Sequence, residues 1–394
     1  MHSHRLAFAP CLVAGALFTG NARAFVLERL GDGYDTGQSA YGISLAGVGD
    51  KLLVAFGDSA GNLNVTRFSV ASDGTIKRYG TTPTNEDVTS TAMDFGYLPG
   101  SNTMYWANVV NNGDNNSRLI VWKLSGGGPV RMDSQEIGYL SNCDVVTLPS
   151  TATQALFAVG CISPIPQTPG QGVAVIQFYG LVGGTIKNAL SAVMLGWAVP
   201  SSSVKVAYVG MGSTGLPVVL GAYRTSAGEL SLQLVRGKDY ASQLDSPDST
   251  GVLGAADQIA IAADPSARKA EVAVRKPSGK IEMTEWSVSS TDKLGAGDVV
   301  SNGSGSDPAV GYLYGSYWGT ADRNDDGNLD VDVLLPGLHE ADDGGGTTQC
   351  APALETGYSG IDGRMYTAVA TSAGNLKLIA WRAGGFSLYY PYSP

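Results

Sequence analysis

Short runs of alternating polar and apolar residues recur along most of this chain. Four clear examples begin at a small residue followed closely by glycine, at 59–68, 226–232, 278–286 and 372–381. Glycine accepts the positive φ angle of a tight turn, and an alternation of period two buries one face of a β-strand. Another apolar stretch precedes each glycine. The pattern therefore predicts a series of antiparallel β-hairpins.

We predict seven such hairpins. Their first strands are expected at 52–57, 103–109, 155–161, 217–223, 270–275, 312–318 and 365–370. Their second strands are expected at 62–70, 118–124, 173–179, 229–235, 280–288, 329–335 and 376–382. Further strands are expected before some hairpins at 90–98, 143–148, 204–209 and 258–263, and after others at 75–80, 130–137 and 185–193.

The predicted units repeat at a spacing of roughly 50 residues, close to the length of one blade of a β-propeller. We therefore predict an all-β fold, a seven-bladed β-propeller with four-stranded antiparallel blades. Such a ring must close, because an open edge leaves backbone hydrogen-bonding groups unpaired. Residues 25–30 are a candidate closing strand against the last blade, and 386–392 compete for that place. An eighth unit would have to lie within 236–252, which contains no second glycine turn of this kind.

The first 24 residues differ from the rest. Residues 2–5 are polar and basic, 6–18 are apolar, and 21–24 end in a small-residue cleavage pattern. This order is typical of a secretory signal peptide, and the apolar run is shorter than the roughly 20 residues that span a bilayer. The alternative is a buried N-terminal helix, for which the following sequence offers no helical partner. We therefore expect a signal peptide at 1–24, a single β-propeller domain at 25–394 and a secreted protein, extracellular or periplasmic.

Composition supports an all-β chain, and the net charge excludes some classes of partner. Glycine accounts for 53 residues and only 15% of the residues are charged, which is typical of many short strands joined by turns. The net charge is −10, and it becomes more negative if Arg5 and Arg23 leave with the signal peptide. Nucleic acids and anionic membranes repel such a chain, so we do not expect it to bind either of them. No apolar run after the first 24 residues is a candidate for crossing a bilayer, so we expect no membrane span.

Three cysteines remain after the predicted cleavage site. Cys143 begins one predicted strand and Cys161 ends the next, so an antiparallel hairpin brings them close together. We predict a disulfide between them, which an exported protein permits. Cys350 is then left over as a free or intermolecular thiol.

One turn carries a specific motif, Asp322-Arg323-Asn324-Asp325-Asp326-Gly327-Asn328-Leu329-Asp330. Oxygen-bearing side chains occupy positions 1, 3, 5 and 9, and glycine occupies position 6. Calcium prefers six to eight hard oxygen ligands, and alternate residues of a tight loop can turn their carboxylates inward. We therefore predict one structural Ca²⁺ site, with the ligands Asp322, Asn324, Asp326, Asn328 (through its backbone carbonyl) and Asp330. The alternative is an acidic turn without metal, because Asp, Asn and Gly also favour turns.

The motif resembles the calcium hairpin of the FG-GAP repeats in propellers like those of integrin α-subunits. Asp322, Asn324, Asp326, Gly327 and Asp330 match that pattern. The turn at 58–62 keeps only fragments of it, and 372–374 keep none of its acids. The resemblance implies a calcium-stabilised propeller, although several calcium blades are usual in that family.

The sequence identifies no catalytic residue. It contains no nucleophile elbow, phosphate loop or dinucleotide fingerprint, and a Ser–His–Asp triad would depend on His339. Two functions stay open. The first is a binding or scaffold module for an extracellular protein or glycan. The second is a lyase or hydrolase acting on polysaccharide in the axial funnel, which an axial pocket with two perturbed acids beside Tyr or Arg would favour.

Overall fold

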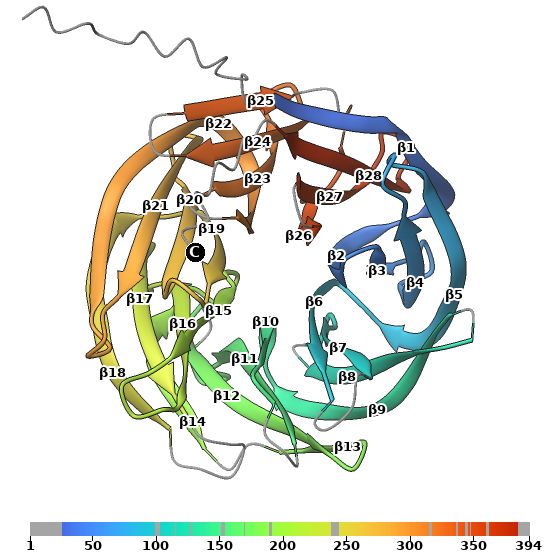
Figure 1. Ribbon diagram of the computed structural model, residues 1–394. Coiled ribbons are helices and arrows are strands. Elements are labelled where there is room, and N and C mark those ends of the chain that lie inside the picture. Colours follow the sequence, from blue (N-terminus) through green and yellow to red (C-terminus); the bar gives the residue numbers. More distant parts are fainter. Residues whose placement is uncertain are drawn as a thin grey trace, which may run out of the picture.

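The computed structural model describes residues 26–98, 103–114, 116–126, 128–150, 154–168, 170–188, 191–237, 244–314, 317–335, 338–342, 346, 348–359 and 362–384. These residues form six antiparallel sheets around a central axis (Figure 1). The predicted signal peptide at 1–24 lies outside the described residues. The described part of the chain contains no helix that is long and apolar enough to cross a membrane.

Each sheet runs from an inner strand near the axis to an outer strand at the rim. The inner strands are β2 (Tyr41–Val48), β6 (Ser90–Tyr97), β10 (Ser141–Leu148), β15 (Val204–Met211), β19 (Gln258–Asp264) and β26 (Ala353–Ser359). The next strands outward are β3 (Lys51–Gly57), β7 (Met104–Asn111), β11 (Ala155–Pro164), β16 (Pro217–Arg224), β20 (Lys269–Arg275), β23 (Tyr317–Asn324) and β27 (Asp362–Ala370).

The third position from the axis is occupied by β4 (Asn62–Val70), β8 (Asn116–Ser125), β12 (Gly172–Val182), β17 (Glu229–Arg236), β21 (Lys280–Val288), β24 (Leu329–Leu335) and β28 (Asn375–Gly384). The outer strands are β1 (Val26–Ser39), β5 (Ile76–Asp87), β9 (Gly128–Tyr139), β13 (Thr185–Lys187), β14 (Ala192–Ala198), β18 (Asp245–Ala255) and β25 (Leu338–Asp342). One further strand, β22 (Leu294–Tyr314), runs from the rim to the axis.

The prediction of seven separate blades was wrong, because the described residues form six sheets. Two of the expected units share β22 and make one seven-stranded sheet, in the order β19-β20-β21-β22-β23-β24-β25. The first half of β22 pairs with β21 as an outer strand, and its second half pairs with β23 as an inner strand. The glycine turns indicate where hairpins form. They do not indicate whether one continuous strand connects two neighbouring hairpins and so places both in a single sheet.

Most strand predictions are confirmed, and two were wrong. Residues 312–318 were expected to form one strand, but β22 ends at Tyr314 and β23 begins at Tyr317. This stretch is rich in aromatic residues, which favour strands. The strand propensity is therefore high both before and after the chain reversal, and it does not reveal the turn between β22 and β23. Residues 185–193 were also expected to form one strand and instead belong partly to β13 and partly to β14.

The ring closes through the N-terminal strand, one of the two candidates that the sequence offered. β1 pairs with β28, from Val26 opposite Gly384 to Ser39 opposite Asn375, in the sheet β1-β28-β27-β26. Main-chain hydrogen bonds therefore join β1 to β28, and β28 is paired on both of its edges. The competing segment at 386–392 lies outside the described residues.

The core lies between neighbouring sheets. β7, β11 and β16 are buried along almost their whole length, because other sheets cover both of their faces. Outer strands such as β5 instead alternate between half-buried and exposed residues. Trp106 on β7 is completely buried, and its indole N–H donates a hydrogen bond of 3.2 Å to the carbonyl oxygen of Ala46 on β2. Large side chains of this kind fill the wedge between sheets that diverge from the axis.

The cysteine prediction is confirmed. Cys143 on β10 and Cys161 on β11 form a disulfide within the same hairpin, and both side chains are buried. Cys350 is a free thiol just before β26. Burial raises the pKa of the Cys350 thiol, so it is less reactive than a solvated cysteine.

Candidate functional site

A cavity of about 690 Å³ lies on the axis of the ring. The inner strands β2, β6, β10, β15, β19 and β26 line it, together with the second half of β22. The six sheets thus contribute seven inner segments, because the seven-stranded sheet supplies both β19 and β22. A cavity of this volume falls within the range of small-molecule sites, about 300–1,000 Å³.

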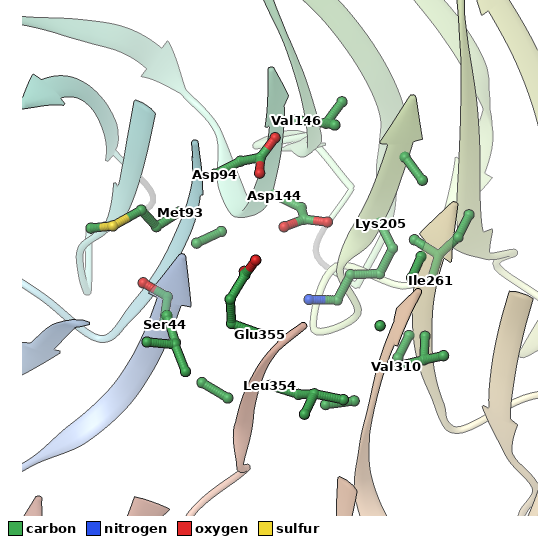
Figure 2. A pocket seen from close by; sticks show the side chains of 18 of the residues that line it. Ser44, Met93, Asp94, Asp144, Val146, Lys205, Ile261, Val310, Leu354 and Glu355 are labelled. Carbon is green, nitrogen blue, oxygen red and sulfur yellow. The ribbon is translucent and has the colours of Figure 1, made fainter. Parts of the chain in front are cut away.

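Four charged side chains project toward this cavity from four different strands (Figure 2). They are Asp94 on β6, Asp144 on β10, Lys205 on β15 and Glu355 on β26. In Figure 2 the carboxyl group of Glu355 lies in the open space between the strands, and the Lys205 ammonium approaches from the side. The cavity therefore combines three acids with one base.

Hydrogen bonds to the next strand hold two of these acids in place. The Asp94 Oδ2 atom accepts hydrogen bonds from the backbone N–H (2.6 Å) and the hydroxyl group (2.9 Å) of Thr147 on β10. The Asp144 Oδ2 atom accepts a bond of 3.1 Å from the backbone N–H of Val206 on β15. Each acid thus joins its own inner strand to the following one, so the same contacts fix the ring and orient the carboxylates.

Burial shifts two of the carboxyl groups toward the protonated form. It raises the pKa of Asp94, and the nearby Asp144 carboxylate adds to this shift while the hydrogen bonds from Thr147 oppose it. Burial also raises the pKa of Glu355 well above its usual range, and the charge of Asp94 acts in the same direction. A carboxyl group in such a place keeps its proton to a higher pH than a solvated one and can donate it.

The rest of the lining mixes hydroxyl groups with apolar surface. The hydroxyl groups of Ser44 and Thr91 are 2.6 Å apart, and the Thr356 hydroxyl donates to the carbonyl oxygen of Tyr312 at 2.6 Å. Met93 and Leu354 supply apolar side chains to the same cavity. The lining can therefore pair with a ligand that has both hydroxyl groups and apolar faces.

The predicted calcium motif lies away from the axis, on the hairpin that joins β23 to β24. The Asn324 Oδ1 atom accepts hydrogen bonds from the backbone N–H groups of Asp326 (3.1 Å) and Asn328 (2.9 Å). The Asn328 carbonyl oxygen accepts the N–H of Asn324 at 2.9 Å, and Asp326 is exposed. These three predicted ligands thus shape or flank the turn.

The other two predicted ligands meet at the base of the hairpin. Asp322 and Asp330 are opposite each other in the β23–β24 ladder, and Asp332 joins them. One carboxylate oxygen from each of the three lies within 4.8 Å of the others. Burial and the neighbouring acids, first Asp330 and then Asp332, raise the pKa of Asp322 to about 8. Sequence reasoning missed Asp332, although it follows Asp330 by two residues and so shares its face of the strand.

Sequence reasoning also missed all four charged residues of the axial cavity. They lie between about 50 and 260 positions apart, so no motif groups them. The available signal was a charged residue in a short, otherwise apolar or hydroxyl-bearing inner strand, as in Thr91-Ala92-Met93-Asp94. This pattern alone does not distinguish a strand at the axis from a strand at the rim, because that distinction depends on how the sheets are arranged in the ring.

No protein-family model matches the chain, and no curated protein matches it. Solved structures share its fold. The fucose-specific lectin from Aleuria aurantia is 13% identical, with 77% of this chain and 96% of that chain covered and a TM-score of 0.52. A putative 6-phosphogluconolactonase from Bacteroides uniformis is 13% identical, with 84% and 92% covered and a TM-score of 0.55. The chain is a β-propeller.

A variant of the Aleuria aurantia lectin in complex with α-methyl-L-fucoside is similar to the same extent, at 12% identity, 77% and 96% coverage and a TM-score of 0.51. At these identities the likeness concerns the fold of this propeller alone. Membership of the FG-GAP calcium propellers, which the hairpin motif implied, is not shown.

Proposed function

We propose that this propeller binds a neutral or cationic saccharide in its axial cavity. The observation that supports the proposal is the convergence of Asp94, Asp144 and Glu355 with Lys205 in one cavity of about 690 Å³. An anionic ligand is disfavoured, because the cavity holds three acidic side chains and only one basic side chain. A carboxylate has about four acceptor positions, so adjacent hydroxyl groups of a sugar can add donors to those that the protein already supplies.

The apolar part of the lining supports the same ligand class. The C–H faces of a sugar ring can pack against the side chains of Met93 and Leu354 while its hydroxyl groups meet the polar side chains. Two of the similar structures are of a fucose-specific lectin, one of them with a fucoside bound. These lectins show that the fold can carry a sugar site, and they do not indicate where this chain would hold one.

A second function, glycoside cleavage in the same cavity, is favoured by the raised pKa of Glu355. A protonated carboxyl group can donate its proton to the glycosidic oxygen as that bond breaks. A second carboxylate, such as Asp144, would take a proton from the attacking water. This is the hydrolase that the sequence left open.

The binding proposal is tested by screening purified protein against a glycan array and then measuring affinity by calorimetry. Glu355→Gln and Asp94→Asn should each weaken binding about tenfold or more, because each puts an NH2 group, which cannot accept a hydrogen bond, in place of one carboxyl oxygen that faces the cavity. Asp298→Asn, at an exposed position in the outer half of β22, is the matched control and should bind like the wild type. If the wild type binds no saccharide, or if both axial variants bind as tightly as the control, the axial proposal is wrong.

The hydrolase proposal has its own readout. Release of reducing ends from each bound glycan should depend on Glu355 and should disappear in Glu355→Gln. Binding without any release of reducing ends in the wild type leaves a lectin and rejects the hydrolase.

We also propose that the chain acts outside the cytoplasm. The buried Cys143–Cys161 disulfide supports this, because such bonds persist in oxidising compartments. Expression of the full chain in a secreting host should yield an exported protein whose N-terminal sequence begins at Phe25. An N-terminus that still carries the first 24 residues on a retained protein would contradict both the signal peptide and the export.

A further inference from the structure

A second polar site is built between β22, β23 and β24, away from the axial cavity. In the β23–β24 ladder, Asp322 is opposite Asp330 and Thr320 is opposite Asp332. Residues two positions apart on a strand point to the same face, so these four side chains share one face of the sheet. The three carboxylates each place an oxygen within 4.8 Å of the other two. Like charges directly opposite each other destabilise a strand pair unless something compensates them.

An independent observation comes from β22, which is not part of the acidic hairpin. The Asn302 side chain reaches this face, and its Nδ2 atom donates to Asp332 Oδ2 at 2.8 Å and to Thr320 Oγ1 at 3.3 Å. Asn302 is only 6% exposed, and its Oδ1 atom has no hydrogen-bond partner among the described residues. Asp322 is only 2% exposed, and its Oδ1 atom likewise has none. Buried acceptors without donors are rare in folded proteins and point to a missing partner.

The chain also keeps space for the Asp322 carboxylate. A Cβ atom on Gly305 would lie 2.1 Å from Asp322 Oδ2, so any larger residue there would collide with the carboxylate. Gly305 belongs to β22, near the point where that strand passes from its outer to its inner half.

We propose that this face binds one Ca²⁺ ion, held by Asp322, Asp330, Asp332 and the Asn302 amide oxygen. All of these donors are hard oxygens, which suit Ca²⁺, and two or more carboxylates can coordinate it through both oxygens to reach six to eight ligands. The Asn302 amide presents its oxygen once it rotates by half a turn, which exchanges two atoms of nearly equal size. The Thr320 hydroxyl group lies on the same face and can complete the shell.

This site differs from the hairpin loop that the sequence motif predicted. Asn324 caps the turn, the Asn328 carbonyl oxygen closes it, and Asp326 is exposed. The ion would therefore bind at the base of the hairpin, with Asp332 and Asn302 in place of Asn324, Asp326 and Asn328. There it would link β22 to β23 and β24 and so fasten together the two halves of the seven-stranded sheet.

Calorimetric titration of the chelator-treated full chain with CaCl₂ separates the two sites. Asp332→Asn should weaken Ca²⁺ binding about tenfold or more, because it removes a ligand charge. Asp326→Asn is the matched control, since it makes the same chemical change in the same hairpin, and it should bind like the wild type. Saturating Ca²⁺ should raise the Tm of the wild type and of Asp326→Asn by about 3 °C or more, and that of Asp332→Asn by much less.

Three results would overturn the proposal. The first is a wild type that binds no Ca²⁺ at millimolar concentration. The second is loss of binding in Asp326→Asn but not in Asp332→Asn, which would place the ion in the loop. The third is equal affinity for Mg²⁺, which would show an unselective acidic face and not a site built for Ca²⁺. Asn302→Ala gives a second test if Asp332→Asn does not fold: it removes no charge and should still weaken binding.

Discussion

Replacing Asp292 by Asn tests how the propeller's sheets are fastened to each other. Asp292 lies in the turn between β21 and β22 and is completely buried. Its carboxylate forms ion pairs with Arg236 at 3.0 Å and with Arg268 at 2.5 Å. It also accepts hydrogen bonds from the backbone N–H (3.0 Å) and the hydroxyl group (2.7 Å) of Ser213. One carboxylate thus joins the sheet β15-β16-β17-β18 to the seven-stranded sheet.

The size of the effect follows from two estimates. Removing one partner of a buried ion pair costs about 3–5 kcal/mol, and the lower end applies here because both arginines are 19% exposed. Burial alone would raise the pKa of Asp292, but the bonds from Ser213 and Arg268 outweigh it and lower the pKa to about 2 from 3.8. A shift of that size corresponds to about 2.4 kcal/mol of stability. We therefore expect Asp292→Asn to lose about 2–3 kcal/mol at pH 7.

The contribution of Asp292 to the stability should also depend on pH. A carboxyl group with a lowered folded-state pKa stabilises the protein above its unfolded pKa, and that stability disappears as the pH falls from about 4 toward 2. Urea unfolding at pH 7, 5, 4 and 3 should show the difference between wild type and Asp292→Asn shrinking with falling pH. Asp245→Asn is the control, because Asp245 also pairs with Arg236, at 2.7 Å, but is 56% exposed. Its loss should cost less than about 1 kcal/mol. A loss at pH 7 as small as that of the control, or one independent of pH, would refute the reasoning.

Two further predictions concern other buried groups. Burial, then the Glu285 charge, raises the pKa of Glu271 to about 8, so wild-type stability falls as the pH rises from about 4.5 to 8. The free energy of unfolding of Glu271→Gln should therefore exceed that of the wild type by about 2–4 kcal/mol at pH 9 and by almost nothing at pH 4. Thermal unfolding of both proteins at the two pH values measures this difference. A difference that is the same at both pH values would contradict the prediction. Replacing Cys143 and Cys161 together by Ala should cost about 3 kcal/mol, because the disulfide closes a loop with a sequence separation of 18. Reductant should then shift the wild-type Tm but not that of the double variant, and a shift in both would point to another cause.

The sequence by itself determined most of the strands and the hairpins, and it offered the strand that closes the ring. These features depend on neighbours along the chain: alternation places every second residue on one face, and glycine permits the turn. The same local logic placed Cys143 and Cys161 at facing positions of one hairpin, where the structure joins them. The sequence also offered 25–30 as a closing strand, in competition with 386–392, and the structure pairs β1 with β28.

Tertiary structure alone decided the number of sheets, the composition of the axial site, and the addition of Asp332 and Asn302 to the site at the base of the hairpin. β22 continues from one hairpin into the next, which local periodicity does not distinguish from two separate strands. The axial acids Asp94, Asp144 and Glu355 come from three inner strands, and Asn302 reaches Asp332 from another strand. The axial acids meet only because the sheets pack around a common axis, and Asn302 meets Asp332 only because β22 continues from one hairpin into the next within one sheet. Packing is set by the burial of whole faces, and no local pattern records which distant strands those faces bring together.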